Sequence, residues 1–310
     1  MTKKGISKAI HAANRYENFP VGSLIVPKKH RSFIVNVYNF ARLADDIADE
    51  GKLNNDERLK LLDLFEKVLK NPSHYKFKNE KKNLKIEQKI INVTLMTHLI
   101  CNESPVFKNL LLKLLKAFRY DASFKPFENW DEIYNYCENS ANPIGRILLE
   151  LFEIPKFSNG IETKNLIFFM SDSICTGLQI INFAQDSKED DFKGRPTFPK
   201  NIWPENITHI KKEQFSKLSS NVKLALVEKL AIKGIEKLND GKNLPKILRN
   251  INTKFSFRFA LEISLIIECG LNISKKILKN PNCVWTKPPK LKLYQFPKIF
   301  FYSLINVILK

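Results

Sequence analysis

Apolar residues recur at spacings of three and four along most of the chain, and turn-forming residues divide this pattern into helical segments. Strict alternation of apolar and polar positions, which would indicate strands, is rare. The pattern therefore predicts an all-α protein. A short helix is expected before a break at 18–22, and Pro27 precedes a long helix that ends at 51–55. The later helices are expected at 57–70, 86–100, 106–118, 130–152, 162–191, 213–239, 244–270 and 299–309.

Single residues refine this pattern at three places. Asp56 is the expected N-cap of the helix over 57–70, because its short side chain can accept a hydrogen bond from the first turn. Pro143 lies inside the helix expected over 130–152, where its missing N–H predicts a kink. The Lys- and Asn-rich stretch 75–84 predicts an exposed loop. No linker separates two folding domains, so we expect one domain over 1–285 and a basic, apolar tail over 286–310.

The composition narrows the class of protein. A chain of 310 residues can bury a sizeable core, and the scarcity of Gly, with 10 residues, suits helices. The formal net charge of +19 would suit nucleic-acid binding, but the Lys residues are scattered and no Arg cluster with interleaved aromatic residues occurs. We therefore expect no nucleic-acid partner. A basic surface also favours anionic substrates and anionic lipid headgroups.

The cysteines and the chain ends bear on location. Five Cys without a CxxC pair indicate a reducing compartment, and neither a disulfide scaffold nor a zinc site. Residues 1–19 lack the apolar core of a signal peptide, and no uninterrupted apolar run reaches the length of a membrane span. We expect a cytoplasmic protein. Its tail mixes Lys with Leu and Phe, which predicts either peripheral contact with the inner membrane, the slightly favoured alternative, or a helix docked on the body.

Two acidic patterns far apart in the sequence carry the candidate chemistry. Asp45 and Asp49 are four residues apart, so their carboxylates lie about 6 Å from each other on one helix face. Asn182, Asp186 and Asp190 repeat that spacing. Carboxylates stacked in this way repel each other unless a cation neutralises them. Oxygen ligands on two helix faces therefore indicate Mg²⁺ held between the protein and a substrate diphosphate.

A solvated helix face is the ordinary explanation of one such pattern. Here both patterns follow apolar sequence, in 35–44 and 174–184, as expected for carboxylates that line the mouth of a pocket. Because there are two matched patterns, a metal site and a solvated face are about equally good interpretations on these residues alone.

The segments around the two patterns resemble the two aspartate-rich motifs of the squalene/phytoene synthase family. Residues 38–49 (Tyr-Asn-Phe-Ala-Arg-Leu-Ala-Asp-Asp-Ile-Ala-Asp) resemble the first motif. Residues 179–190, followed by Lys193-Gly194-Arg195, resemble the second. The order and separation match over roughly residues 11–285. The resemblance implies a class I isoprenoid synthase-type helical bundle around one central cavity, a catalytic domain over 1–285, Mg²⁺ as cofactor and a prenyl diphosphate as substrate.

Within this family the sequence looks most like the hydroxysqualene synthases of bacterial hopanoid biosynthesis. The similar features are 17–21 (Glu-Asn-Phe-Pro-Val), 136–146 (Tyr-Cys-Glu-Asn-Ser-Ala-Asn-Pro-Ile-Gly-Arg) and Gln185 before Asp186. The resemblance implies that presqualene diphosphate loses diphosphate and that water captures the cation as hydroxysqualene. It also implies other squalene and hopanoid pathway enzymes as partners. Pro196 and Thr197 depart from the family, which has an aromatic residue there.

The resemblance assigns a role to each candidate residue. Tyr38 and Tyr136 are expected to form pocket walls whose rings stabilise carbocations, and Gln179 to supply a polar group near the site. The expected Mg²⁺ ligands are Asp45, Asp49, Asn182, Asp186 and Asp190. The expected diphosphate-binding residues are Arg42, Lys193 and Arg195. Each basic residue also has a plain alternative: Arg42 can form a salt bridge to Asp45, and the other two can be ordinary exposed cations.

Other functions stay open at this point. A head-to-head prenyltransferase would join two farnesyl or geranylgeranyl diphosphates into presqualene diphosphate, dehydrosqualene or phytoene, and the sequence does not reveal the pocket depth that distinguishes them. Non-catalytic assembly factors of respiratory complexes share the family, but they lose the acidic stacks that this chain keeps. No His follows a Glu by three positions, which excludes a di-iron bundle, and no GxGxxG indicates a nicotinamide site, which disfavours a reductive squalene synthase.

Overall fold

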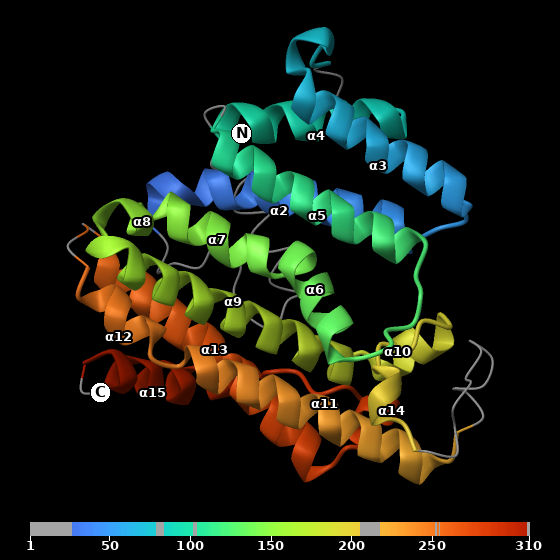
Figure 1. Cartoon of the computed structure of the whole chain (residues 1–310), viewed down its shortest axis with the longest axis vertical. Helices are drawn as coiled ribbons and strands as arrows, with labels where there is room; N and C mark the ends of the chain where they lie inside the picture. The colour runs from blue at the N-terminus through green and yellow to red at the C-terminus, as the bar shows by residue number, and fades with distance from the viewer. Residues whose placement is uncertain are drawn as a thin grey trace. The chain divides into compact units, whose positions relative to one another are not determined.

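A computed structural model describes residues 27–78, 84–101, 104–204, 218–251, 253 and 255–308. Throughout these ranges the chain forms helices and no strand, so the predicted all-α class is confirmed (Figure 1). The described chain divides into two compact units, the first ending at Phe124 and the second beginning at Lys125. The short helix expected before the break at 18–22 lies outside the described residues.

In the described part of the first unit, four helices pack together through apolar side chains. Phe40 of α2 meets Phe65 of α3 edge to face, with ring centroids 5.2 Å apart, and Phe33 of α2 lies 4.9 Å from Phe107 of α5. The hydroxyl of Thr97 in α4 donates to the backbone oxygen of Asn36 in α2. The helices are α2 (Lys28–Asp49), α3 (Asn55–Lys70), α4 (Ile86–Ile100) and α5 (Pro105–Ala122), with a 3-10 turn, η1, at Pro72–His74.

The expected N-cap of α3 is wrong by two residues. Asn54, not Asp56, accepts a hydrogen bond from the N–H of Glu57, and the Glu57 carboxylate accepts one from the N–H of Asn54. This reciprocal capping box satisfies two backbone donors, whereas Asp56 lies in the first turn, where its charge favours the helix N-terminus. α4 has the expected bounds, and α5 extends four residues beyond the expected end.

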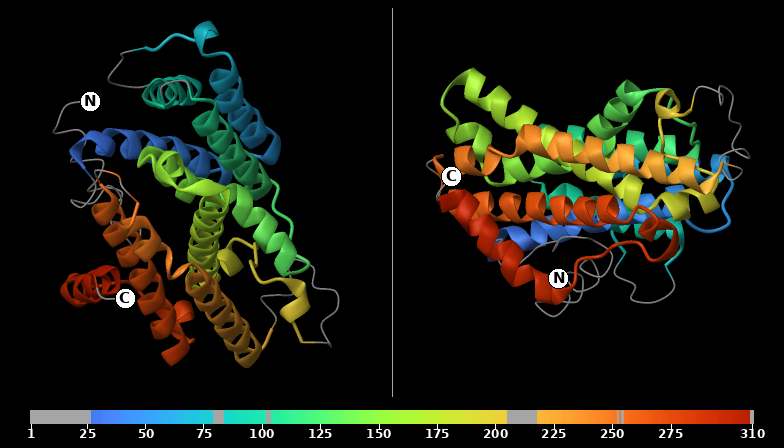
Figure 2. Two further views of the ribbon diagram at one scale, coloured as in Figure 1. Left: turned by 60° about the vertical axis from the view of Figure 1, so that its left-hand side comes forward. Right: turned by 90° about the horizontal axis from the view of Figure 1, so that it is seen from below.

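The second unit is built around α9, which packs against α7, α11 and α13 (Figure 2). Among the described residues α9 is the one helix long and apolar enough to cross a membrane by length and composition, and half of that window is buried in the structure. The helices are α6 (Trp130–Ser140), α7 (Asn142–Leu151), α8 (Ile154–Phe157), α9 (Gly160–Gln185), α10 (Ser187–Phe192), α11 (Ser220–Gly241), α12 (Leu244–Arg249), α13 (Ser256–Lys279), α14 (Cys283–Thr286) and α15 (Phe296–Ile308), with 3-10 turns η2 (Lys200–Ile202) and η4 (Leu293–Gln295).

Two glycines allow α9 and α11 to pack unusually closely. A Cβ atom on Gly177 of α9 would lie 2.9 Å from the backbone oxygen of Gly234 in α11. A Cβ atom on Gly234 would lie 2.5 Å from Ile181 and 3.1 Å from the backbone oxygen of Gly177. Any side chain at either position would push the two backbones apart, so this contact fixes the separation of the helix that carries the second acidic pattern and its main neighbour.

Three segments predicted as single helices are each divided in two. The segment 130–152 divides at Ala141, because Pro143 cannot donate and instead occupies the first turn of α7. The segment 162–191 divides at Asp186. The segment 244–270 divides in the turn after Ile251, where the Ser256 hydroxyl donates a hydrogen bond to the Ile251 backbone oxygen. The helix predicted to end at Gly270 instead continues to Lys279 as α13. Gly270 lies inside α13, where it packs closely against Leu178.

The C-terminal helix α15 packs on the second unit, against α13 and α12 (Figure 2). Ile299, Ser303 and Val307 form its buried stripe. Ser264 of α13 donates to the backbone oxygen of Ser303 at 3.2 Å, and Asn306 donates to the Glu268 carboxylate at 3.1 Å. The docked arrangement predicted as one alternative for the tail is therefore present, while the division of the chain at residue 285 stays a prediction.

Candidate active site

The first acidic stack lies on the last turns of α2, where Arg42 of the same helix offsets part of its charge. Arg42 donates to the Asp45 carboxylate at 3.2 Å and to the Glu50 carboxylate at 3.0 Å. It also lies 2.7 Å from Asp46. Partial burial works to lower the pKa of the Arg42 guanidinium, but the neighbouring carboxylates outweigh it and leave this pKa above its ordinary value. The plain alternative for Arg42, a salt bridge to Asp45, is thus present.

Asp46 differs electrostatically from the stacked residues beside it. Its Oδ1 is buried and, although close to Arg42, has no hydrogen-bond partner of good geometry among the described residues. Burial raises the pKa of Asp46, and the Arg42 charge, which acts the other way, does not cancel this effect. A single cation, Arg42, thus faces the carboxylates of Asp45, Asp46 and Glu50, and negative charge is in excess there.

Arg58 of α3 holds the end of α2 in place. This nearly buried guanidinium donates to the backbone oxygens of Ile47 at 2.6 Å, Leu53 at 3.0 Å and Gly51 at 3.2 Å. Gly51 has a φ of +79°, which L-residues with a side chain rarely adopt. The turn that follows the first stack is therefore fixed by a neighbouring helix.

The second stack lies where α9 gives way to α10. The break is local, because the Asp186 N–H still donates to the Asn182 oxygen at 2.8 Å and the Asp190 N–H to the Asp186 oxygen at 2.9 Å. The Ser187 hydroxyl donates to the backbone oxygens of Phe183 and Ala184, a type of bond that bends helices. Helical spacing therefore continues through the bend, and Asn182, Asp186 and Asp190 keep one face.

The loop after α10 turns back onto the second stack. Gly194 has a φ of +66°, its N–H donates to the Asp191 oxygen, and the Arg195 N–H donates to the Asp190 oxygen, a Schellman motif. The buried hydroxyl of Thr197 then donates to the Asp190 carboxylate at 3.3 Å. Lys193 forms an ion pair with Glu189 at 2.9 Å. Thr197, noted in the sequence only as a departure from the family, is thus a positioning residue for Asp190.

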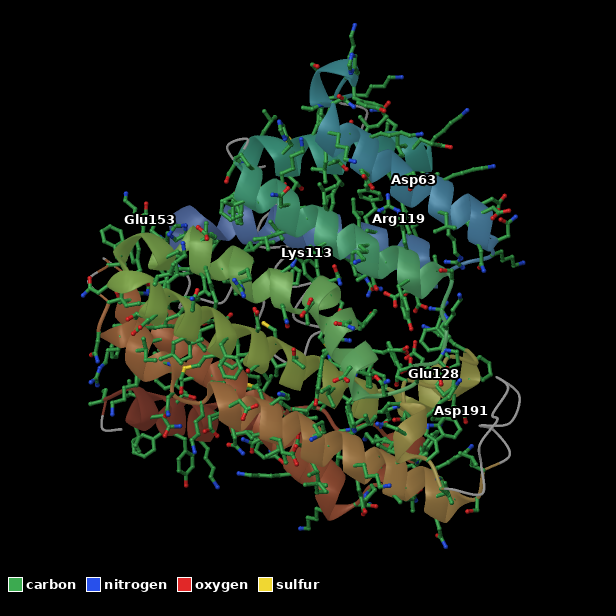
Figure 3. The ribbon with its side chains drawn as sticks, in the orientation of Figure 1. Asp63, Lys113, Arg119, Glu128, Glu153 and Asp191 are labelled. Atoms are coloured by element: carbon green, nitrogen blue, oxygen red, sulfur yellow. The ribbon has the colours of Figure 1, made fainter. Side chains whose placement is uncertain are left out.

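Two further contacts connect α10 and the end of α9 to distant parts of the second unit. Asp191, labelled in Figure 3, pairs with Lys223 of α11 at 3.1 Å, and both side chains are mostly buried. Lys223 also lies over the ring of Trp285. The buried amide of Gln185 donates to the backbone oxygen of Pro289 at 2.8 Å. No spacing in the sequence indicated these partners, because they lie 32 and 104 residues away.

Aromatic rings surround the start of the second stack. Tyr136 of α6, Phe127 and Phe183 form a cluster with ring centroids 5.6 to 6.0 Å apart, and Phe183 directly follows Asn182. Tyr136 therefore packs against Phe183, which is one residue along α9 from Asn182. Gln179 is half-buried one turn before Asn182, and Tyr38 is half-buried on α2 one turn before Arg42. Their catalytic roles stay predictions.

The segment 142–146 has a structural explanation of its own. A Cβ atom on Gly145 would lie 2.5 Å from the Ser171 hydroxyl, so only glycine allows α7 to approach α9 here. Arg146 forms a bidentate ion pair with Asp172 of α9 at 2.8 and 2.6 Å. The buried Asn142 amide oxygen accepts from Thr176. These contacts fix the bend between α6 and α7 to the helix that carries the second stack.

The oxygen donors of both stacks fit Mg²⁺, which prefers carboxylate and amide oxygens and keeps several ligand positions for water or phosphate. Within the described residues no three His, Cys, Asp or Glu side chains form a complete metal site by themselves. The joint ligand set predicted from the sequence stays a prediction.

Comparisons with known proteins agree with this arrangement. The family model described as squalene/phytoene synthase matches residues 12–292. The chain is 34% identical over 257 residues to a protein named hydroxysqualene synthase from Sinorhizobium fredii (strain NBRC 101917 / NGR234), covering 83% of this chain and 77% of the relative. A relative of the same name from Rhodopseudomonas palustris (strain ATCC BAA-98 / CGA009) is 33% identical and is covered over 76% of its length, or 82% of this chain.

Solved structures show the same fold. A dehydrosqualene synthase in complex with a ligand superposes with a TM-score of 0.70 at 18% identity, covering 97% of this chain and 95% of the other. A squalene synthase from Alicyclobacillus acidocaldarius superposes with a TM-score of 0.62 at 23% identity, over 90% and 96% of the two chains. The expected isoprenoid synthase helical fold is confirmed.

Proposed function

Because this chain belongs to the squalene/phytoene synthase family of enzymes, we propose that it converts presqualene diphosphate into hydroxysqualene, with loss of diphosphate and capture of water. The observation that carries the proposal is the second acidic stack, whose one-face spacing survives the break between α9 and α10 and is supported by the following loop. The identity of 34% and 33% to two proteins named hydroxysqualene synthase supports the choice of reaction within the family.

The acidic stacks would hold Mg²⁺ through Asp45 and Asp49 in the first unit and through Asn182, Asp186 and Asp190 in the second. When bound, the metal would supply charge stabilisation for the departing diphosphate. The Schellman turn at Gly194 and the Thr197 hydroxyl keep Asp190 in position for this task. Lys193 and Arg195 follow directly, so their charges would bind the same anion.

The aromatic cluster would protect the carbocation that remains after diphosphate leaves. The faces of Tyr136, Phe127 and Phe183 carry negative electrostatic potential, which stabilises a positive charge, and their bulk excludes solvent. Arg42 would bind the diphosphate at the first stack, and Asp45, which accepts a hydrogen bond from it, would be one of the residues that hold the metal.

Capture of the final cation needs a held water molecule. Two polar groups in the segments that resemble hydroxysqualene synthases are both engaged, Asn142 by Thr176 and Gln185 by Pro289. The Ser140 hydroxyl, next to the break at Ala141, is buried and has no hydrogen-bond partner in the described part of the chain. We therefore assign the water to Ser140, and expect Ser140→Ala to shift the product from alcohol to polyene.

The deciding experiment is a parallel incubation with presqualene diphosphate and farnesyl diphosphate, with Mg²⁺ and no reductant, followed by mass identification of products. Conversion of presqualene diphosphate to an alcohol is expected. Efficient condensation of farnesyl diphosphate to presqualene diphosphate or dehydrosqualene would replace the proposed reaction with head-to-head prenyl transfer. No turnover of either substrate by folded protein would contradict the proposal altogether.

A further inference from the structure

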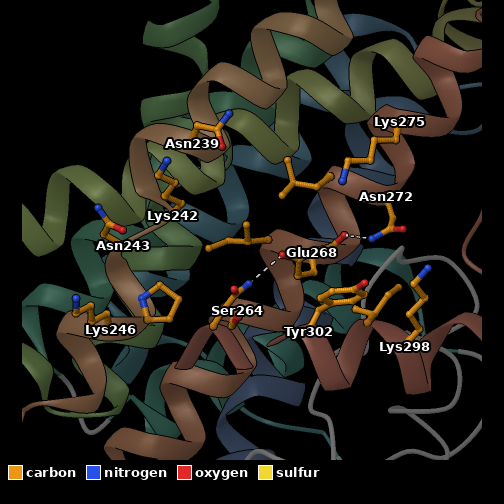
Figure 4. A pocket seen from close by; sticks show the side chains of 15 residues that line it. Asn239, Lys242, Asn243, Lys246, Ser264, Glu268, Asn272, Lys275, Lys298 and Tyr302 are labelled. Atoms are coloured by element: carbon orange, nitrogen blue, oxygen red, sulfur yellow. Dashed lines mark hydrogen bonds between the residues drawn. The ribbon is translucent and has the colours of Figure 1, made fainter. Parts of the chain in front are cut away.

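A cavity of about 690 Å³ opens on the second unit between the α11–α12 corner, α13 and α15 (Figure 4). It is separate from the second acidic stack. Gly241, next to this corner, packs against Ile174 of α9. Ile174 precedes Asp186 by twelve residues, so the two are about 18 Å apart along the helix. No residue of the proposed catalytic machinery lines the cavity.

The cavity is strongly basic. Lys242, Lys246, Lys275 and Lys298 line it from different elements, and Glu268 is its one acidic side chain. The Glu268 carboxylate already accepts a hydrogen bond from Asn306. Three of the lysines come from the corner and from α13, and Lys298 comes from α15. A site with this excess of positive charge and with amide side chains around it suits a phosphate group.

An exposed apolar surface lies beside the cavity on the same helix. Phe301 is 61% exposed and Ile308, two turns later on the same side, is 49% exposed, opposite the buried stripe of Ile299, Ser303 and Val307. Leu293, just before α15, is 88% exposed. Tyr302 and Lys298 turn from this outer side toward the cavity. Isolated exposed apolar residues are ordinary, but several large ones gathered on one helix indicate a docking surface.

The chain segment that follows Glu268 carries charge of one sign. No Asp or Glu follows Glu268 up to Ile308, whereas seven lysines do: Lys275, Lys276, Lys279, Lys287, Lys290, Lys292 and Lys298. A second copy of the chain docking symmetrically here would oppose the same lysines to each other, which disfavours a homodimer through this face. An anionic bilayer offers phosphate groups that attract the lysines, and its headgroup–acyl boundary can take up Phe301 and Leu293.

We propose that this face of the second unit docks on an anionic membrane, with a lipid phosphate in the lysine-lined cavity and the outer stripe of α15 at the headgroup boundary. α15 lies on the protein body in this arrangement and does not leave it to bind. The outward stripe and the basic cavity act together, because single weak membrane contacts become stable when an apolar and an electrostatic contact combine.

The test is flotation of the full chain with phosphatidylcholine vesicles, with and without phosphatidylglycerol. Removing α15 would uncover the apolar face of α13, so point variants are used instead. The variant Lys242→Gln/Lys246→Gln/Lys275→Gln is matched by Lys60→Gln/Lys113→Gln/Lys116→Gln, which removes the same charge from exposed positions of the first unit. Phe301→Ser is matched by Phe169→Ser on α9, where the ring is 56% exposed.

We expect flotation of the unaltered chain only with anionic vesicles, decreasing with salt. The cavity variant should bind at least about tenfold more weakly, since each lysine near an anionic surface contributes about fivefold. Phe301→Ser should bind several-fold more weakly, and both controls should bind like the unaltered chain. Equal binding by all variants would overturn the proposal, and so would an equal loss in the first-unit control, which would indicate net charge alone.

Inorganic phosphate distinguishes a lipid site from a site for a free anion. Titrated against the protein, it is expected to compete with vesicles only through general screening, as chloride does at equal ionic strength. Tight binding of inorganic phosphate that the cavity variant abolishes, with vesicle binding unchanged, would overturn the membrane assignment. Circular dichroism of each variant verifies the fold, and none of the substituted residues belongs to the proposed active site.

Discussion

The acidic face of α2 and the acidic face at the α9–α10 junction carry the same four-residue spacing but are held differently. The first sits on an unbroken helix, and Arg42 of that helix offsets part of its charge. The second sits at a bend. The Thr197 hydroxyl of the following loop donates to the Asp190 carboxylate, and the Gly194 and Arg195 N–H groups donate to the backbone oxygens of Asp191 and Asp190. The first face thus depends on charge balance, and the second on backbone geometry.

Both acidic faces are expected to belong to the active site, and one carboxylate substitution in each face tests this. Asp49→Asn and Asp186→Asn should each lower turnover by roughly a thousandfold, because loss of a metal carboxylate removes several kcal/mol of charge stabilisation. Helical circular dichroism should stay unchanged. Asp240→Asn on α11, an exposed carboxylate, is the matched control and should keep full activity. A normal rate for either stack variant would remove that face from the site.

A second variant tests the geometric support of the α9–α10 face. Thr197→Val keeps the shape of the buried side chain but removes the hydroxyl that donates to Asp190. We expect the Mg²⁺ concentration for half-maximal activity to rise about tenfold, as loss of a supporting hydrogen bond to a metal ligand usually causes. Thr197→Ser keeps the hydroxyl and should restore most of the affinity. Equal behaviour of the two variants would assign Thr197 to packing alone.

Charge balance on α2 is tested with Arg42→Gln. Three carboxylates then lose their cation, and we expect the free energy of unfolding to fall by about 1 kcal/mol at low salt. Added Mg²⁺ should stabilise this variant more than the unaltered chain, because the metal can replace the missing charge. Urea unfolding with and without Mg²⁺ measures both effects. No difference in the Mg²⁺ response would show that α2 does not need a cation.

The smallest expected effect concerns Asp46. Burial raises the pKa of its carboxyl above the ordinary 3.8, so the folded state binds this proton more tightly than the unfolded state. Ionisation of Asp46 therefore costs stability as the pH rises through the raised pKa. Asp46→Asn should increase the free energy of unfolding at neutral pH by only a few tenths of a kcal/mol, because solvent screens this partly exposed carboxyl, and the gain should disappear below the ordinary pKa.

Glu66 of α3 provides the opposite control for that pH dependence. Hydrogen bonds from Lys70 and Arg119 lower the pKa of Glu66 despite partial burial, and Arg119 also pairs with Asp63 (Figure 3). Its stabilising contribution is present above the ordinary pKa of 4.5 and is lost as the pH falls through the lowered value. Glu66→Gln should thus destabilise at neutral pH and have no effect in acid. Parallel pH profiles of the two variants would contradict these assignments.

Sequence patterns predicted the helix that carries Asp45 and Asp49 because its apolar spacing and its boundaries are local there, while the role of these residues stays a prediction. The same reasoning placed Asn182, Asp186 and Asp190 on one helix but missed the bend, since Ser187 acts through backbone oxygens that any residue carries. It also missed Lys223 and Pro289, whose contacts depend on how distant segments fold together. Gly270 was misread as an end because glycine marks both termini and close packing.

The hydrogen bond from Gln185 to the backbone oxygen of Pro289 has a consequence for how the protein can vary. A carbonyl oxygen is common to all amino acids, so substitutions at 289 that keep the local backbone retain the acceptor. An insertion or deletion between α14 and α15 would displace that oxygen and leave a buried amide unsatisfied at the end of α9, at a cost of about 1–3 kcal/mol. The connection therefore tolerates changes of identity and resists changes of length.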